Sequence, residues 1–396
     1  MKNNPLSLVT SQDPALSARG FVFWITRFDW WLAAGIFLLI VLGSMTILST
    51  VIAPGVSLFK DTVFATHLFN ATIGIILFLV FSVIDYRLLR HFSWFLYVLM
   101  IAILGLVLVI GFTSRGSVRW IDLGFFRFQP SELAKIFFII SMAAYFSSIK
   151  ERIAQFRYVL FSIGLMAVPT ALVLLEPDLG TGLVFIAIWA GMLILSGARI
   201  RHLVILGILS IATLPIAWFF ILAPYQKDRI HVFIDPKIDP LGKGYAVIQS
   251  IIAVGSGKLL GRGWGRGTQS HLQFLPERHT DFIFATLAEE LGYLGVIILL
   301  GAFSLVLFRI LRIAQHASDS FGGYICIGFF TLIIFHAIVN IGMNIGIMPI
   351  TGIPLPLVSY GGSALIVNLI GLGIVESVAV RRQTASQSMM LGDRDE

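Results

Sequence analysis

The stretch PERHTDFIFATLAEEL, residues 276–291, places one carboxylate, Asp281, at the start of a long apolar run. It ends a segment, residues 223–280, that holds eight Lys or Arg against four Asp or Glu. An acid at the mouth of a membrane-spanning helix, beside a basic loop, predicts chemistry on an anionic, lipid-linked substrate. The alternative role is structural, because an acid in the first turn of a helix can act as its N-cap and interacts favourably with the helix dipole.

Composition defines the setting in which this acid lies. Of the 396 residues, 57% are hydrophobic and only 12% are charged, whereas about 25% of the residues of a soluble domain are charged. Apolar runs of about 20 residues, each long enough to cross a bilayer core, recur along the chain. We therefore expect an all-α polytopic membrane protein with about ten transmembrane helices and one large extracytoplasmic loop between the seventh and eighth. The predicted spans are residues 30–52, 63–84, 92–112, 131–148, 158–175, 180–197, 201–222, 281–310, 322–345 and 362–380.

The Lys and Arg residues of the short loops predict the orientation. One set of alternate loops is basic, and the positive-inside rule then places both termini in the cytoplasm. Two of the opposite loops, 113–130 and 223–280, are also basic and break the rule, but long loops cross the membrane whatever their charge. The predicted organisation is a cytoplasmic tail (1–29), a ten-span membrane domain (30–380) with the outer loop 223–280, and a second cytoplasmic tail (381–396). No apolar run followed by a small-residue cleavage site precedes residue 28, so we expect no cleaved signal peptide.

The glycine-rich run GSGKLLGRGWGRG, residues 255–267, resembles a nucleotide-binding loop but fails the test of spacing. A P-loop needs a glycine where Ile252 stands and a Ser or Thr where Leu259 stands. What remains is a flexible backbone with interleaved cations, which predicts a cradle for a diphosphate. The cations that we expect to hold a diphosphate are Arg115, Arg119, Lys243, Lys258 and Arg262.

Other polar residues lie inside predicted spans. Glu132 and Lys135, three residues apart, are expected to form a buried ion pair. His336, Asn340 and Asn344 form a stripe on one helix face, which predicts hydrogen bonds between helices. Four small residues share the helix face of Asp281, so that face is predicted to admit another helix or a lipid tail. These small residues are Ala285, Ala288, Gly292 and Gly295.

Several segments together resemble one family, the SEDS proteins (shape, elongation, division, sporulation). The segments are GFFRFQPSELAK (124–135), EPDLGTG (176–182), DPLGKGYAVIQS (239–250), LPERHTDFIFATLAEELG (275–292) and TGIPLPLVSYGGS (351–363). Arg278 and the stretch GWGRGTQSHLQFLPER favour the elongation branch, typified by RodA, over the division branch. One departure is Ala364, where many members have a second Ser after Ser363.

The resemblance implies a peptidoglycan glycosyltransferase that polymerises lipid II, the undecaprenyl-diphosphate-linked disaccharide peptide, on the outer face of the bacterial cytoplasmic membrane. It implies that Asp281 is the essential aspartate, and that Glu132 and Lys135 are an important buried pair. Independently, transfer from a lipid diphosphate needs no general acid, because the leaving group is already good. One carboxylate can serve as general base, while cations stabilise charge on the departing diphosphate.

The resemblance also implies partners. These are a class B penicillin-binding protein, a single-span transpeptidase, and other membrane proteins of the elongation complex, but no nucleic acid. The transpeptidase span is expected to dock on the eighth and ninth spans, where glycines at 322, 323 and 328 would permit close approach. No cofactor is assured, and a divalent cation, Mg²⁺ or Mn²⁺, stays open. Two other functions remain as alternatives: a lipid II flippase, and a non-enzymatic scaffold for the transpeptidase.

Overall fold

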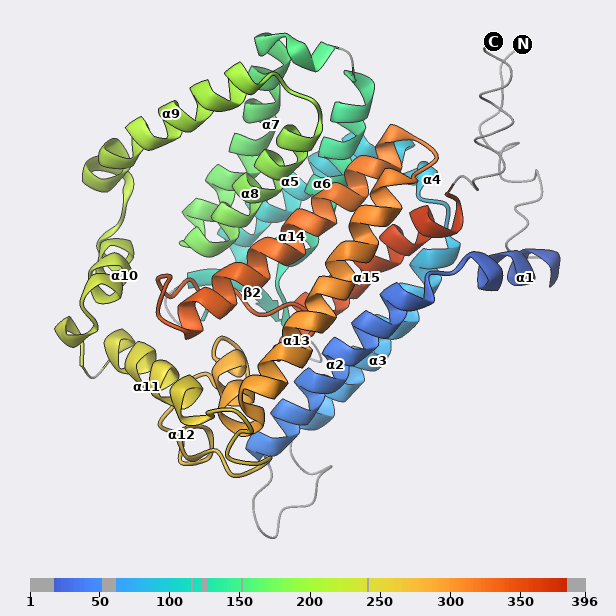
Figure 1. Cartoon of the computed structure of the whole chain (residues 1–396). Helices are drawn as coiled ribbons and strands as arrows, with labels where there is room; N and C mark the ends of the chain where they lie inside the picture. The colour runs from blue at the N-terminus through green and yellow to red at the C-terminus, as the bar shows by residue number, and fades with distance from the viewer. Residues whose placement is uncertain are drawn as a thin grey trace, which may run out of the picture.

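The computed structural model describes residues 18–51, 62–114, 117–122, 127–150, 152–240 and 242–382. Long helices run side by side as a bundle, with shorter elements at both ends (Figure 1). The main helices are α2 (Trp30–Val51), α3 (Thr62–Val83), α5 (Ser93–Ile110), α6 (Pro130–Ser148), α7 (Phe156–Leu175), α8 (Leu179–Leu195), α9 (Ile200–Ile216), α13 (Ile283–Gln315), α14 (Ser320–Asn344) and α15 (Gly362–Val380). These ten helices coincide with the ten predicted spans to within a few residues, so the predicted all-α membrane architecture is confirmed.

Short elements connect the long helices. They are α1 (Ala18–Arg27), α4 (Arg87–His91), α10 (Pro224–Ile234), α11 (Lys243–Ser256), α12 (Thr268–His271), and the single turns Arg152–Ala154, Ala217–Ile221 and Pro236–Ile238. Three antiparallel strands, β1 (Phe112–Ser114), β2 (Ser117–Asp122) and β3 (Arg127–Phe128), form a small sheet in the order β1-β2-β3. Seven helices of the described chain are long and apolar enough to cross a membrane.

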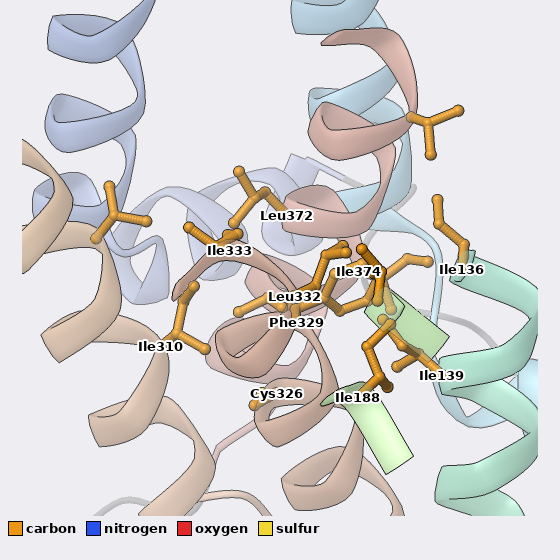
Figure 2. Packing of buried hydrophobic residues seen from close by; sticks show 14 of the residues in the cluster. Ile136, Ile139, Ile188, Ile310, Cys326, Phe329, Leu332, Ile333, Leu372 and Ile374 are labelled. Atoms are coloured by element: carbon orange, nitrogen blue, oxygen red, sulfur yellow. The ribbon is translucent and has the colours of Figure 1, made fainter. Parts of the chain in front are cut away.

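Helix α14 lies at the centre of the bundle. Its Phe329 and Leu332 pack among side chains from α15, α6, α8 and α13, including Leu372, Ile139 and Ile188 (Figure 2). Close packing here depends on glycine, because burying apolar surface requires the helices to approach without a gap. A Cβ on Gly371 would lie 2.1 Å from the Phe329 ring.

The glycines expected to receive a partner helix serve this internal packing instead. A Cβ on Gly322 would lie 2.9 Å from the ring of Tyr86, and one on Gly328 would lie 2.6 Å from Ile139. Both neighbours belong to the same chain, so these two glycines leave no room for a foreign helix. The docking argument from Gly322 and Gly328 was therefore wrong, while the half-buried Gly323 leaves a Cβ no closer than 3.5 Å to its neighbours.

Charged side chains join the helices at the bundle end that carries α1 and α4. Buried Asp29 accepts hydrogen bonds from the guanidinium of Arg309 and lies 3.4 Å from Nη1 of Arg382. Its main-chain N–H donates to Oε1 of Glu376 at 2.7 Å. A buried charge is tolerated when it is paired and hydrogen-bonded, and this network ties the first long helix to the ends of α13 and α15.

Helix α9 stands apart from the bundle, together with α10 (Figure 1). Its apolar residues are exposed, including Val204, Ile208 and Ile211. At its first turn buried His202 packs against the ring of Phe156. Helix α10 then leads into α11 and α12, the elements that surround the start of α13.

Candidate functional site

Asp281 lies immediately before α13, but it does not occupy the N-cap position of that helix. The N-cap is Phe282, whose side chain makes no capping hydrogen bond. A side-chain cap comes from another helix, because Oδ1 of Asn344 accepts a hydrogen bond from the main-chain N–H of Ala285 at 3.1 Å. The cap that the structural alternative assigned to Asp281 is thus supplied by α14.

The main chain around Asp281 is held from two directions. Its carbonyl oxygen accepts hydrogen bonds from Nδ2 of Asn340 at 3.1 Å and from Nδ2 of Asn344 at 3.0 Å. One residue earlier, the Thr280 carbonyl accepts from the hydroxyl of Ser359 at 2.7 Å. The predicted hydrogen bonding is confirmed for Asn340 and Asn344, whose partner is the backbone of the candidate catalytic residue. It is not confirmed for His336, because neither ring nitrogen of this buried histidine has a hydrogen-bond partner among the residues that the structure describes.

Helix α13 is broken at Gly292, which has φ 64° and ψ −161°. The break separates a short half-helix, residues 283–291, from the long span that follows. The backbone groups freed at the break bond to the glycine-rich segment: Arg262 N donates to Glu289 O at 2.9 Å, and Tyr293 N donates to Lys258 O at 2.9 Å. Buried backbone groups need such partners, so the segment completes the helix.

This break corrects the prediction that small residues form one continuous helix face extending from Asp281 into the membrane. Ala285 and Ala288 lie on the half-helix, but Gly292 ends it, so Gly295 does not continue the same face. The glycine-rich segment also covers the half-helix, since a Cβ on Gly257 would lie 1.9 Å from the Ala288 carbonyl oxygen. No groove for a lipid tail runs along that face.

The main-chain N–H groups of the glycine-rich run donate hydrogen bonds within the chain itself. They are therefore not free to form the predicted backbone cradle for a diphosphate, and that prediction is corrected. Gly261 N donates to Gly257 O at 2.8 Å, and Gly263 N donates to Glu290 O at 3.1 Å. The glycines are needed for close approach of two backbones. The side chains of Lys258 and Arg262 are exposed, and Nε of Arg262 donates to the hydroxyl of Ser256 at 3.0 Å.

Glu289 and Glu290 hold this segment in place. The buried carboxylate of Glu289 accepts hydrogen bonds from Gln269 N at 2.8 Å, from Ser270 N at 3.1 Å and from the Ser270 hydroxyl at 2.9 Å. Glu290 lies 3.0 Å from Nε2 of His271. Both carboxylates anchor α12 to the half-helix.

A polar cavity of about 110 Å³ opens beside Asp281. Its lining comes from β2, α6, α8, α14 and the 352–354 segment: Trp120, Gln129, Glu132, Lys135, Asp178, Thr181, Val184, His336, Gly352, Ile353 and Pro354. Gly352 links the cavity to the acid, because a Cβ at this residue would lie 3.7 Å from Oδ2 of Asp281. The cavity has room for several water molecules.

The predicted pair of Glu132 and Lys135 lies in the wall of this cavity. Nζ of Lys135 is 2.8 Å from Oε2 of Glu132, and both side chains are buried. The contact is a close ion pair without the alignment of a hydrogen bond. Because the lysine charge is balanced locally, the cavity can stay polar within an apolar bundle.

Comparison with known proteins identifies the family. The model of the FtsW/RodA/SpoVE family, described as "Cell cycle protein", matches residues 30–384. The chain belongs to this family. The SEDS resemblance drawn from the motifs is thereby confirmed.

The peptidoglycan glycosyltransferase MrdB of Escherichia coli (strain K12) is 45% identical over 316 residues, which cover 80% of this chain and 85% of MrdB. Stage V sporulation protein E of Bacillus subtilis (strain 168) is 38% identical over 326 residues, 81% of this chain and 88% of that protein.

Two solved structures share this SEDS fold. One belongs to work described as "Structural coordination of polymerization and crosslinking by a peptidoglycan synthase complex", with a TM-score of 0.76 and 33% identity over 90% of this chain and 99% of the other. The second is the rod shape determining protein RodA of Thermus thermophilus, with a TM-score of 0.67 and 28% identity. It covers 90% of this chain and 98% of RodA.

The candidate diphosphate ligands of this SEDS protein are only partly placed. Arg115 lies outside the described residues, while Arg119 is in β2 and Lys243 is the first residue of α11. Sequence reasoning missed Arg229, whose Nη1 donates to the Thr351 carbonyl at 3.1 Å, next to Gly352. Its position in a long basic loop gave no reason to single it out.

No group of three or more His, Cys, Asp or Glu able to hold a metal ion occurs among the residues that the structure describes. A role for Mg²⁺ or Mn²⁺ stays a hypothesis.

Arg278 supports the segment that precedes Asp281. Its guanidinium donates to the Ser270 carbonyl at 2.9 Å, and burial lowers its pKa.

Proposed function

We propose that this chain polymerises lipid II on the outer face of the cytoplasmic membrane, with Asp281 as the catalytic carboxylate. The chain is a multi-pass membrane enzyme, a peptidoglycan glycosyltransferase like MrdB. The observation that supports the site is the arrangement at Asp281: a clamped backbone and a polar cavity beside the carboxylate. The Lys and Arg residues of the short loops support the outward orientation, with both termini in the cytoplasm, and the long basic loop 223–280 is compatible with it because long loops cross the membrane whatever their charge.

The proposed reaction uses Asp281 as a general base. The carboxylate removes the proton from the acceptor sugar hydroxyl, that oxygen bonds to the donor anomeric carbon, and the bond from this carbon to the diphosphate oxygen breaks. The electron pair leaves on undecaprenyl diphosphate, which nearby cations stabilise. A single carboxylate fits this reaction, whereas glycoside hydrolysis uses a pair.

Purified protein incubated with labelled lipid II tests the activity. We expect a ladder of glycan strands in detergent or liposomes when a transpeptidase without a polymerase site of its own is added, and the reaction is measured with and without it. Movement of labelled lipid across vesicles without any polymer would favour the flippase. Polymer that appears only when a partner with its own polymerase site is added would favour the scaffold.

We predict that at least one cation among Arg115, Arg119, Lys243, Lys258 and Arg262 holds the diphosphate. Removing one charged hydrogen bond costs about 1.5–3 kcal/mol, so kcat/KM of the affected alanine variant should fall roughly 10- to 150-fold. Lys150→Ala is the matched control, since this exposed lysine lies at the end of α6 away from Asp281. Five alanine variants with unchanged kcat/KM would move the diphosphate site elsewhere.

We also propose that a single-span transpeptidase docks on the exposed face of α13. The structure related at TM-score 0.76 belongs to a peptidoglycan synthase complex, which supports a partner of this class. In α14, whose residues are all described, only Ile338 is exposed, so the ninth span offers little surface. Helix α13 presents an exposed stripe at helical spacing with small residues at its middle: Leu294, Ile297, Gly301, Ser304 and Phe308.

Cysteine crosslinking tests this docking. Cysteines at Leu294, Ile297 and Gly301 should crosslink to cysteines along the partner span, because small residues permit close helix approach. The native Cys326 is fully buried and should not interfere. Cysteines at Ile76 and Leu79 of α3, which are also exposed, serve as controls. Crosslinks confined to the first three spans, α2, α3 and α5, would rule out the docking on α13.

A further inference from the structure

Two asparagines on α14, one helical turn apart, converge on the main chain at Asp281. Asn340 and Asn344 have no solvent exposure. Nδ2 of Asn340 donates to the carbonyls of Asp281 and Ile353, at 3.1 and 2.8 Å. Nδ2 of Asn344 donates to the carbonyls of Asp281 and Asn340, at 3.0 and 2.8 Å. Each amide therefore uses both of its N–H groups on backbone oxygens.

Asn344 also sets the start of the half-helix that follows Asp281. Its Oδ1 accepts from Ala285 N, a capping bond that Phe282 at the N-cap position cannot supply. One side chain thus bonds to the residue before the N-cap and to the third residue inside the helix. The positive end of a helix dipole favours negative charge, so the same contacts keep the Asp281 carboxylate at that end.

Asn340 links the acid to the wall of the cavity. Its second hydrogen bond goes to Ile353, the neighbour of Gly352, and a Cβ on Gly352 would lie 3.7 Å from Oδ2 of Asp281. The amide therefore joins the main chain of Asp281 to the segment that lies beside its carboxylate. The separation between carboxylate and cavity is set by α14, a buried helix in the packed centre of the bundle.

We propose that Asn340 and Asn344 are positioning residues, which fix the Asp281 carboxylate against the polar cavity without contacting the substrate. The inference rests on the proposed catalytic role of Asp281. It goes further, because it assigns a function in catalysis to the main-chain clamp and to the cap provided by α14. A reacting group displaced by about 1 Å can lose roughly 10²-fold in rate, so a clamp of this kind affects turnover more than binding.

The test compares kcat and KM for lipid II in Asn344→Ala and Asn340→Ala. We expect kcat to fall roughly 10- to 100-fold in each variant while KM changes less than about 3-fold. Asn340→Ala leaves the Asn344 cap in place, so it supplies the result if Asn344→Ala does not fold. The matched control is Asn368→Ala on α15, another buried asparagine, whose Nδ2 donates to the Ala364 carbonyl at 2.8 Å.

Thermal unfolding of all three variants in the same detergent separates positioning from stability. We expect Asn368→Ala to lower the midpoint of thermal unfolding while keeping the wild-type kcat. Wild-type kcat in Asn340→Ala and Asn344→Ala would overturn the proposal, as would a loss of kcat in Asn368→Ala of the same size. Asp281→Asn is measured in parallel: if it is inactive while the asparagine variants are normal, only the positioning role fails. If Asp281→Asn is as active as wild type, the proposed function itself fails.

Discussion

Asp281→Asn should lower the rate of lipid II polymerisation by about 10²- to 10⁴-fold, the usual contribution of a general base. The substitution keeps the size of the side chain and removes its negative charge. The backbone clamp involves the carbonyl of residue 281 and the cap comes from Asn344, so neither depends on the carboxylate. We therefore expect folding and thermal stability close to wild type.

Asp235→Asn is the matched control for this variant. Asp235 is an exposed acid of the same loop, and its Oδ1 accepts from Lys237 N at 3.0 Å. Its loss removes one negative charge from the loop 223–280, and Asp235 does not line the cavity. We expect the control to polymerise lipid II at the wild-type rate. An equal loss of activity in both variants would mean that the loop charge matters rather than this carboxylate.

Gly261→Ala should disrupt the packing of the glycine-rich segment against the half-helix. The residue has φ +79°, and an added Cβ would lie 2.0 Å from the Glu290 carbonyl oxygen. A left-handed conformation costs an L-residue about 1–2 kcal/mol, and forced overlap adds about 1–3 kcal/mol. We expect a loss of about 2–5 kcal/mol in the free energy of unfolding, together with lower activity, since this segment supports the entry to Asp281.

Gly265→Ala separates the two costs. Gly265 also has a positive φ, +72°, but no atom lies within 4 Å of an added Cβ. Only the conformational cost of about 1–2 kcal/mol should appear, with activity retained. Denaturant unfolding of both variants measures the difference. Equal destabilisation of the two would show that the close approach of Gly261 to Glu290 is not what holds the segment.

The transmembrane helices could be predicted from the sequence because the bilayer imposes one requirement on every span. About 20 apolar residues are needed, and all backbone groups must bond within the segment. The helix at residues 283–315 shows where this reasoning ends. Gly292 stands inside an apolar run, and hydropathy contains no sign that the chain reverses its φ there or which segment completes the break.

Pairs close in sequence were also predictable. Glu132 and Lys135 lie three residues apart on a helix, so their contact follows from helix geometry. The stripe of Asn340 and Asn344 indicated hydrogen bonds to another element, but not that the acceptor would be the carbonyl of Asp281. Such a partner depends on how distant segments pack. For the same reason the small sheet β1–β3 and the position of Arg229 were not foreseen.

The central claim is that this chain forms glycosidic bonds itself and uses the Asp281 carboxylate to do so. The most direct measurement is single-turnover conversion of labelled lipid II by purified wild type and Asp281→Asn, at saturating substrate and with lipid II binding measured on the same samples. We expect unchanged binding, and bond formation slowed at least about 10²-fold in the variant. Bond formation at the wild-type rate by Asp281→Asn would contradict the account.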